Sequence, residues 1–89
     1  MAICPDATST DAEVTIRYWA SARAAAGCDS ERFCGGNVGE VLLAAASAHD
    51  GLGGVLALST ILLDGRPVGD SVPLSEGTTL EVLPPFAGG

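Results

Sequence analysis

The last six residues of the chain have the types and spacing that best suit chemistry. They read Pro84-Pro85-Phe86-Ala87-Gly88-Gly89. Tandem prolines stop strand hydrogen bonding and hold the backbone extended, Phe86 offers one bulky anchor, and the three residues after it carry almost no side chain. A flexible tail over residues 84–89 is slim enough to thread a narrow channel in another protein. It would then place the Gly89 carboxylate in a remote active site.

Catalysis by the other side chains has little support. The absence of lysine excludes Schiff-base, P-loop and lysine-nucleophile mechanisms. His49 is the only histidine and shows no sequence neighbours that would build a metal site or a catalytic triad, so we expect a structural histidine and no metal. No serine lies in a G-x-S-x-G elbow. The carboxylates are scattered, and an acid/base pair among them stays open. We therefore expect a protein that is not itself an enzyme.

The composition describes one small acidic domain. The chain has 89 residues, of which 47% are hydrophobic and 17% charged. This is enough apolar material to fold and too short a chain for a second core. Eleven carboxylates against four arginines give a net charge of -7. Nucleic acid and anionic membranes are therefore poor partners, whereas a basic protein surface suits the chain.

The cysteines and the N-terminal sequence indicate the compartment. Cys4, Cys28 and Cys34 form no C-x-x-C pair, and their odd number fits neither a disulfide framework nor a zinc knuckle. We expect small buried or tail thiols in a reducing compartment. No secretory signal and no membrane-spanning run is visible, which predicts a soluble, cytoplasmic protein.

The pattern along the chain predicts the elements that must hold the tail. Residues 1–12 show no period and are expected to be a disordered tail, which leaves residues 13–83 as the domain. In residues 13–19, side chains for the two faces alternate, which predicts a strand with one buried face. Residues 20–27 suit a short helical turn or wide loop, and residues 31–34 weakly indicate a second strand. Asn37 and Glu40 form a capping-box-like start of the main amphipathic helix, for which Gly51 is the stop.

The second half of the chain adds the remaining strands. Residues 52–59 predict a short helix or turn, 61–63 and 66–68 a hairpin around Asp64-Gly65, and 79–83 the last strand. This order predicts an α+β fold with one main helix on one face of a mixed sheet. If the first and last strands are neighbours, the other face of the sheet is open and a partner can dock there.

Strand alternation assigns residues to the two faces. Val14, Ile16, Tyr18, Leu80 and Val82 are expected to face the helix, which forces their neighbours onto the opposite face. The predicted partner surface consists of Arg17, Trp19, Leu83, Phe86 and Pro67, beside Glu81. The alternative is that Trp19 folds under residues 20–27 as ordinary core.

Three segments together resemble a known family. They are Trp19-Ala20-Ser21-Ala22-Arg23 after the first strand, Asp64-Gly65-Arg66-Pro67-Val68, and Leu80-Glu81-Val82-Leu83 followed by the Pro-Pro-Phe-Ala-Gly-Gly tail. Residues 13–89 are similar to the MoaD family, the small subunit of molybdopterin synthase. The chain departs from the family in its extra acidic N-terminal residues, in Ala24 where glutamate is common, and in Asp64 where many members have asparagine. None of these departures touches the tail.

The resemblance implies a ubiquitin-like β-grasp fold of about five strands and a role as sulfur carrier. It implies that an E1-like, MoeB-like enzyme uses ATP to adenylate Gly89, and that a persulfide or similar donor then leaves a thiocarboxylate there. A MoaE-like large catalytic subunit would receive the tail, with Pro85, Phe86, Ala87 and Gly88 threading its channel. The sulfur would build the dithiolene of molybdopterin from cyclic pyranopterin monophosphate. The chain would be a co-substrate with no bound cofactor.

Two other destinations use the same tail. One is a sulfur carrier for cysteine, thiamine or thio-tRNA formation, because the tail chemistry is identical and partners alone set the pathway. The other is a ubiquitin-like modifier, in which Gly89 ends in an isopeptide bond to a target lysine.

Overall fold

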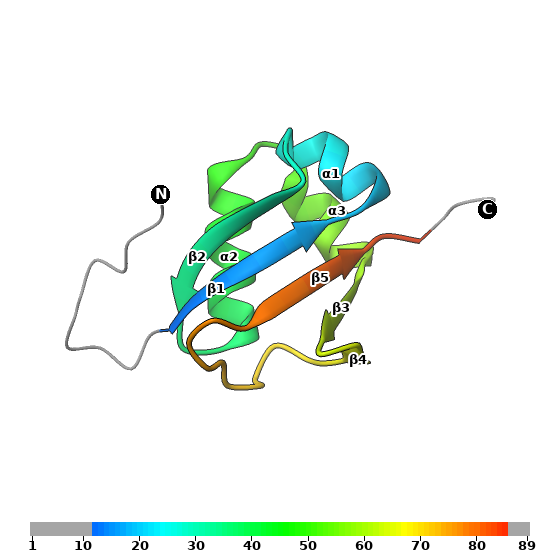
Figure 1. Cartoon of the computed structure of the whole chain (residues 1–89). Coiled ribbons are helices and arrows are strands. Elements are labelled where there is room, and N and C mark those ends of the chain that lie inside the picture. The colour runs from blue at the N-terminus through cyan, green and yellow to red at the C-terminus, as the bar shows by residue number, and fades with distance from the viewer. Residues whose placement is uncertain (1–11, 86–89) are drawn as a thin grey trace.

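One mixed sheet organises the computed structural model, which describes residues 12–85. Within that range the sheet has five strands in the order β2-β1-β5-β3-β4 (Figure 1). The central strands β1 and β5 are parallel, and the other neighbouring pairs are antiparallel. The strands are β1 (Ala12–Tyr18), β2 (Ser30–Gly35), β3 (Thr60–Leu63), β4 (Arg66–Pro67) and β5 (Thr79–Leu83).

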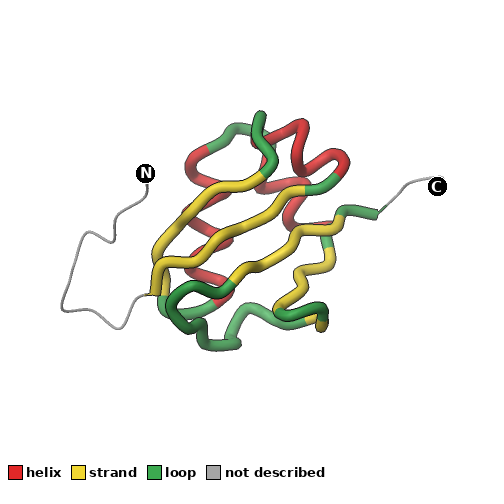
Figure 2. Tube along the Cα trace, in the orientation of Figure 1, coloured by secondary structure: helices red, strands yellow, loops and turns green. Residues whose placement is uncertain are grey.

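All helices of the described range cover the same face of this sheet (Figure 2). They are α1 (Ala20–Ala26), α2 (Val38–Ala48) and α3 (Leu52–Leu58). The predicted α+β fold, with about five strands and one main helix, is confirmed, and α2 is that helix. The two ambiguous segments, 20–27 and 52–59, form the short helices α1 and α3. Gly27 ends α1 in the left-handed region, at φ 76°, where a side chain would be strained.

The first strand differs from its predicted bounds at both ends. It begins at Ala12, which is buried, one residue inside the segment that we assigned to the tail. It ends at Tyr18, because Trp19 is the N-cap of α1. Ala20 then lies at φ 50°, a left-handed conformation that costs an alanine about 1 to 2 kcal/mol. The chain therefore turns sharply from sheet to helix directly after Trp19.

The predicted capping box starts α2. The Asn37 side chain accepts a hydrogen bond from the Glu40 amide at 2.9 Å, and the Glu40 carboxylate accepts one from the Gly36 amide at 2.7 Å. The first bond satisfies an amide that the first helical turn leaves without a partner, and the second satisfies the amide of the residue before the N-cap. A Cβ built at Gly35 would come within 2.7 Å of the Val41 side chain, so a glycine is required for α2 to pack this closely on β2.

The predicted face assignment of β1 and β5 is confirmed. Val14, Ile16 and Tyr18 are buried under the helices together with Leu80 and Val82. Ile16 lies opposite Leu80 across the parallel pair, and a slip by one residue would turn both side chains outward. Burial of such a side chain contributes about 1.5 to 3 kcal/mol, so this register is strongly specified.

Two sequence expectations concern the cysteines and the membrane. Cys28 is a free cysteine, whereas Cys34 is disulfide-bonded, which corrects the expectation that every cysteine is a thiol. Among residues 12–85, none of the helices combines the length and apolar character that crossing a bilayer requires.

Candidate functional site

A row of side chains crosses the face of the sheet that the helices leave uncovered. Arg17 on β1 lies opposite Glu81 on β5, Glu81 lies opposite Leu62 on β3, and Leu62 lies opposite Pro67 on β4. Residues that are paired across a sheet share a face, so these four residues form one line, which we call the open-face row. It runs across four strands and contains two of the predicted partner-binding residues, Arg17 and Pro67.

Trp19 lies beside this row and is held there by two contacts. Its indole Nε1 donates a hydrogen bond to Glu81 Oε1 at 3.2 Å, and the Arg17 guanidinium carbon lies 5.0 Å from the centre of its ring. The side chain is 39% exposed, so the alternative that Trp19 is ordinary core is wrong. The aromatic face attracts the Arg17 cation, and the indole N–H bonds the Glu81 carboxylate. The Trp19 ring is therefore an exposed apolar surface between two charged side chains.

The predicted surface gathers at the end of the sheet where the tail begins. Parallel strands end at the same edge, which brings Trp19 and Leu83 to the same end of the sheet. Leu83 is half-buried, Pro84 is buried and Pro85 is exposed. Pro67 shares the face but lies on the far edge strand, about 14 Å from Arg17 by three inter-strand spacings of about 4.8 Å. The remaining predicted residues, Phe86, Ala87, Gly88 and Gly89, lie outside the described range.

Sequence reasoning missed Leu62, the apolar member of the open-face row. Residues 61–63 read Ile-Leu-Leu, an unbroken apolar run in which alternation assigns no face. The strand register assigns Leu62 to the open face, because Leu62 pairs with Glu81 whereas Ile61 pairs with the core residue Val82.

A second polar constellation lies on the helix side, at the edge strand β2. Glu31 is opposite Ile16 and so points toward the helices. Tyr18 Oη donates a hydrogen bond to Glu31 Oε1 at 2.9 Å, and Nε2 of His49, the C-cap of α2, lies 2.6 Å from the same oxygen. The Cys28 Sγ atom lies within 4.8 Å of both a Glu31 carboxylate oxygen and a His49 ring nitrogen. We call Tyr18, Cys28, Glu31 and His49 the Glu31 cluster.

The environment of the Glu31 cluster favours the protonated forms of the Tyr18 hydroxyl and the Cys28 thiol. Burial raises the pKa of Tyr18 well above its usual range, and the hydrogen bond and charge of Glu31 raise it further. Burial also raises the pKa of Cys28, as does the charge of Glu31. A reactive cysteine needs the opposite shift, because the thiolate is the nucleophile. The cluster therefore does not have the properties of a nucleophilic cysteine site.

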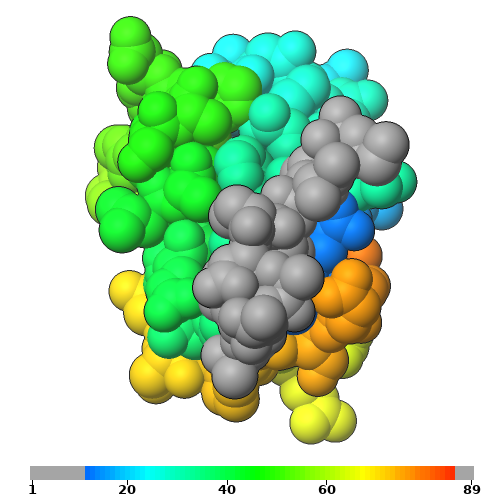
Figure 3. Space-filling view, turned by 90° about the vertical axis from the view of Figure 1, so that its left-hand side faces the viewer, coloured from blue at the N-terminus to red at the C-terminus, as the bar shows by residue number. Residues whose placement is uncertain are grey.

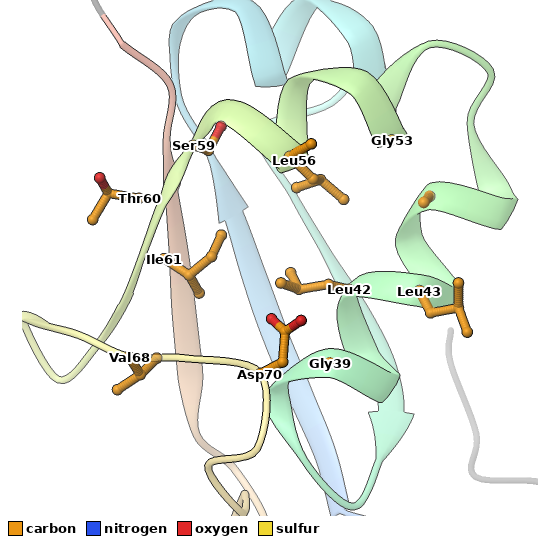
Figure 4. A pocket seen from close by; sticks show the side chains of 12 residues that line it. Gly39, Leu42, Leu43, Gly53, Leu56, Ser59, Thr60, Ile61, Val68 and Asp70 are labelled. Atoms are coloured by element: carbon orange, nitrogen blue, oxygen red, sulfur yellow. The ribbon is translucent and has the colours of Figure 1, made fainter.

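A cleft of about 470 Å³ lies on the helix side of the sheet, between α2, α3 and β3. Figure 4 shows the side chains that line it. Leu42, Leu56, Ile61 and Val68 provide apolar walls, and Asp70 is its one charged lining residue. The cleft contains neither paired carboxylates nor a nucleophile with a base, so its described walls offer no catalytic constellation.

Comparison with known proteins identifies the family. The model of the ThiS family matches residues 16–89, which include the end of β1, all of β5 and the Gly-Gly end of the chain. The chain belongs to the ThiS family. No curated protein matches it.

Solved structures with the fold of this ThiS-family chain come from archaea and bacteria. The HVO 2177 protein of Haloferax volcanii is 29% identical, with a TM-score of 0.79 over 97% of this chain and 94% of its own. Small archaeal modifier protein 1 of Methanosarcina acetivorans is 26% identical, with a TM-score of 0.81 over 89% of this chain and 98% of its own. A complex of subunits 1 and 2 of the molybdopterin-converting factor of Helicobacter pylori contains a chain that is 22% identical. Its TM-score is 0.65 over 86% of this chain and 99% of its own.

These comparisons confirm the resemblance at the level of MoaD/ThiS ubiquitin-like proteins. The fold is the β-grasp fold of sulfur carriers and small modifiers. Members of this group are generally small carriers without catalytic activity of their own.

Proposed function

We propose that this chain is the sulfur-carrying small subunit of a molybdopterin synthase. One observation carries the proposal: the ThiS-family match continues to residue 89, and β5 leads directly into that end of the chain. Gly88 and Gly89 thus lie within the residues that the family model matches. The described domain would hold the tail, and the open face beside it would receive the partners.

The chemistry takes place at the Gly89 carboxylate. A carboxylate is a poor acceptor, so an E1-like enzyme first joins it to the α-phosphate of ATP and releases pyrophosphate. The terminal sulfur of a persulfide then attacks the acyl adenylate, and AMP leaves. A second thiol reduces the resulting acyl disulfide, which frees a thiocarboxylate on Gly89 and oxidises the donor thiols to a disulfide. The sulfur is ionised at neutral pH and nucleophilic, by the same logic as a thiolate.

Two partners would use the open face in turn. The activating enzyme must receive the tail to adenylate it, and a large catalytic subunit must receive it to use the sulfur on cyclic pyranopterin monophosphate. Trp19 and Leu83 lie where the tail begins, and aromatic anchors of this kind dominate binding energy at interfaces. A complex between two subunits of the Helicobacter pylori molybdopterin-converting factor supports a partner of the large-subunit kind. Both partners would be cytoplasmic proteins.

A modifier role is the second candidate, and one comparison favours it. Small archaeal modifier protein 1 of Methanosarcina acetivorans is more similar to this chain than the Helicobacter pylori subunit is, by both identity and TM-score. In that role, the adenylated Gly89 would be attacked by a lysine amine of a target protein instead of a persulfide. AMP would leave in the same way, and the product would be an isopeptide bond.

The intact mass of the protein isolated from its own cells separates these functions. A carrier is heavier by the difference between one sulfur and one oxygen atom, whereas a modifier is found attached to a second protein. The thiocarboxylated chain should then convert cyclic pyranopterin monophosphate to molybdopterin when it is mixed with the large subunit from the same cells. If the thiocarboxylate forms but no molybdopterin appears, the sulfur serves another pathway, such as cysteine, thiamine or thio-tRNA formation.

A further inference from the structure

The Glu31 cluster brings together three different metal-binding groups. The ligand atoms of Cys28, Glu31 and His49 all lie within 4.8 Å of one another. They come from three separate segments: the loop after α1, the edge strand β2 and the end of α2. Figure 3 looks onto the β2 edge of the molecule, where α2 and β2 lie side by side. All three residues are half-buried, so the cluster is shielded without being closed.

A simple ion pair accounts for only part of this arrangement. His49 and Glu31 would form a bridge at 2.6 Å without a third group. The Cys28 thiol nevertheless lies within 4.8 Å of the same carboxylate, and the Tyr18 hydroxyl on the neighbouring strand β1 donates a hydrogen bond to it. A thiol, an imidazole and a carboxylate are the three side-chain types that zinc uses in proteins. Thiolate and imidazole together favour such an ion over magnesium or calcium, which take oxygen ligands.

We propose that Cys28, Glu31 and His49 bind a divalent transition-metal ion of the zinc class, with a fourth position open to water. In a tetrahedral site the ligand atoms stand about 3.3 to 3.6 Å apart, as follows from metal–ligand distances of about 2.0 to 2.3 Å. The His49–Glu31 contact of 2.6 Å is shorter than this, and no pair of ligand atoms is more than 4.8 Å apart, so modest side-chain rotations suffice. Metal binding displaces the Cys28 thiol proton into solvent. Tyr18 is the positioning residue, because its hydroxyl fixes the ligating carboxylate.

An ion can reach this site from solvent. A surface hollow of about 500 Å³ borders Cys28 and is also lined by Gly27 and Asp29. Arg23, the basic residue at this hollow, is held in an ion pair with Asp29 at 2.6 Å. The net charge of -7 further favours the approach of a cation. The proposal is independent of the sulfur-carrier function, because it involves none of the residues of the tail.

Titration of the full-length, metal-free protein with Co²⁺ and Zn²⁺ tests the site. We expect one Co²⁺ per chain, with the absorption bands of a tetrahedral ion that carries a thiolate, and displacement of Co²⁺ by Zn²⁺. Because His49 is the only histidine, its ring resonances report the site directly in NMR spectra and should shift with one equivalent of Zn²⁺. Cys28→Ser and His49→Ala should each weaken Co²⁺ binding by at least about ten-fold. Asp50→Asn, which removes an exposed carboxylate next to His49, should leave it unchanged.

Two results would overturn the proposal. One is His49 ring resonances in the unmodified protein that do not move at saturating Zn²⁺, a measurement that needs no variant and so does not depend on the folding of one. The other is a Cys28→Ser variant that is folded by circular dichroism and keeps both the affinity and the thiolate band, because the metal would then be held by other cysteines.

Discussion

Tyr18 and Trp19 are consecutive residues that donate hydrogen bonds to two different glutamates. The two glutamates lie on opposite faces of the sheet. Trp19 reaches Glu81 at 3.2 Å on the open face, and Tyr18 reaches Glu31 at 2.9 Å on the helix side. The first contact is exposed, whereas the second is partly buried, and its carboxylate also contacts His49 and lies near Cys28. The same pairing of an aromatic donor with a carboxylate thus has two environments, and the difference between them is access to water.

This difference separates the two regions by role. In water an exposed hydrogen bond or ion pair adds little to stability, so the open-face row can exchange its contacts for those of a partner. On the helix side the lower dielectric strengthens each interaction and makes an unpaired group costly. The open face is therefore suited to binding, and the helix side to holding its groups in place.

The largest expected effect comes from comparing consecutive residues on β5. Leu80→Ala should lower the free energy of unfolding by about 2 to 5 kcal/mol, because Leu80 is fully buried under the helices. Glu81→Ala should lower it by less than about 1 kcal/mol, because only an exposed contact is lost. Urea denaturation of both variants measures the difference. Equal losses would mean that the two faces do not differ as described.

Trp19→Ala should weaken the complexes with both the activating enzyme and the large subunit by about 1 to 4 kcal/mol. Leu58→Ala is the matched control, because Leu58 is a large apolar residue that is 73% exposed on α3, away from the open face. Isothermal titration calorimetry gives both affinities, and circular dichroism checks that the variants are folded. If Leu58→Ala is the more damaging change, partners dock on the helix side. Leu83→Ala and Phe86→Ala should behave as Trp19→Ala does.

Tyr18→Phe should cost about 0.5 to 1.5 kcal/mol of stability at neutral pH, the usual net value of one hydrogen bond. The folded protein raises the pKa of Tyr18, so above pH 10 the unfolded chain loses a proton that the folded chain retains. Tyr18 should therefore contribute a loss of stability as the pH rises above 10, and Tyr18→Phe should remove that part of the loss. Tyr18 is the only tyrosine, so phenolate absorbance follows its titration without interference. Normal titration near pH 10 in the folded state would contradict the buried environment.

The open face was predictable from sequence because its signal is local. Alternation along β1 and β5 is enough to place Arg17, Trp19 and Leu83, and the capping box at Asn37 fixes where α2 begins. The Glu31 cluster has no such signal. Its members come from four segments, and they meet only because the register of β2 turns Glu31 inward and α2 ends above it. The disulfide state of Cys34 and the face of Leu62 were likewise set by tertiary structure.

Sulfur transfer by variants of the two terminal glycines is the most direct test of the carrier function. Deletion of Gly89 removes the carboxylate carbon that must be adenylated, and Gly88→Ala adds a Cβ that a narrow channel would not admit. Each variant is activated with ATP and its partner enzyme, and thiocarboxylate formation and transfer to the pterin precursor are then measured. We predict complete loss for the deletion, strong loss for Gly88→Ala, and thermal unfolding identical to that of the unmodified protein. Full sulfur transfer by the Gly89 deletion would contradict the account.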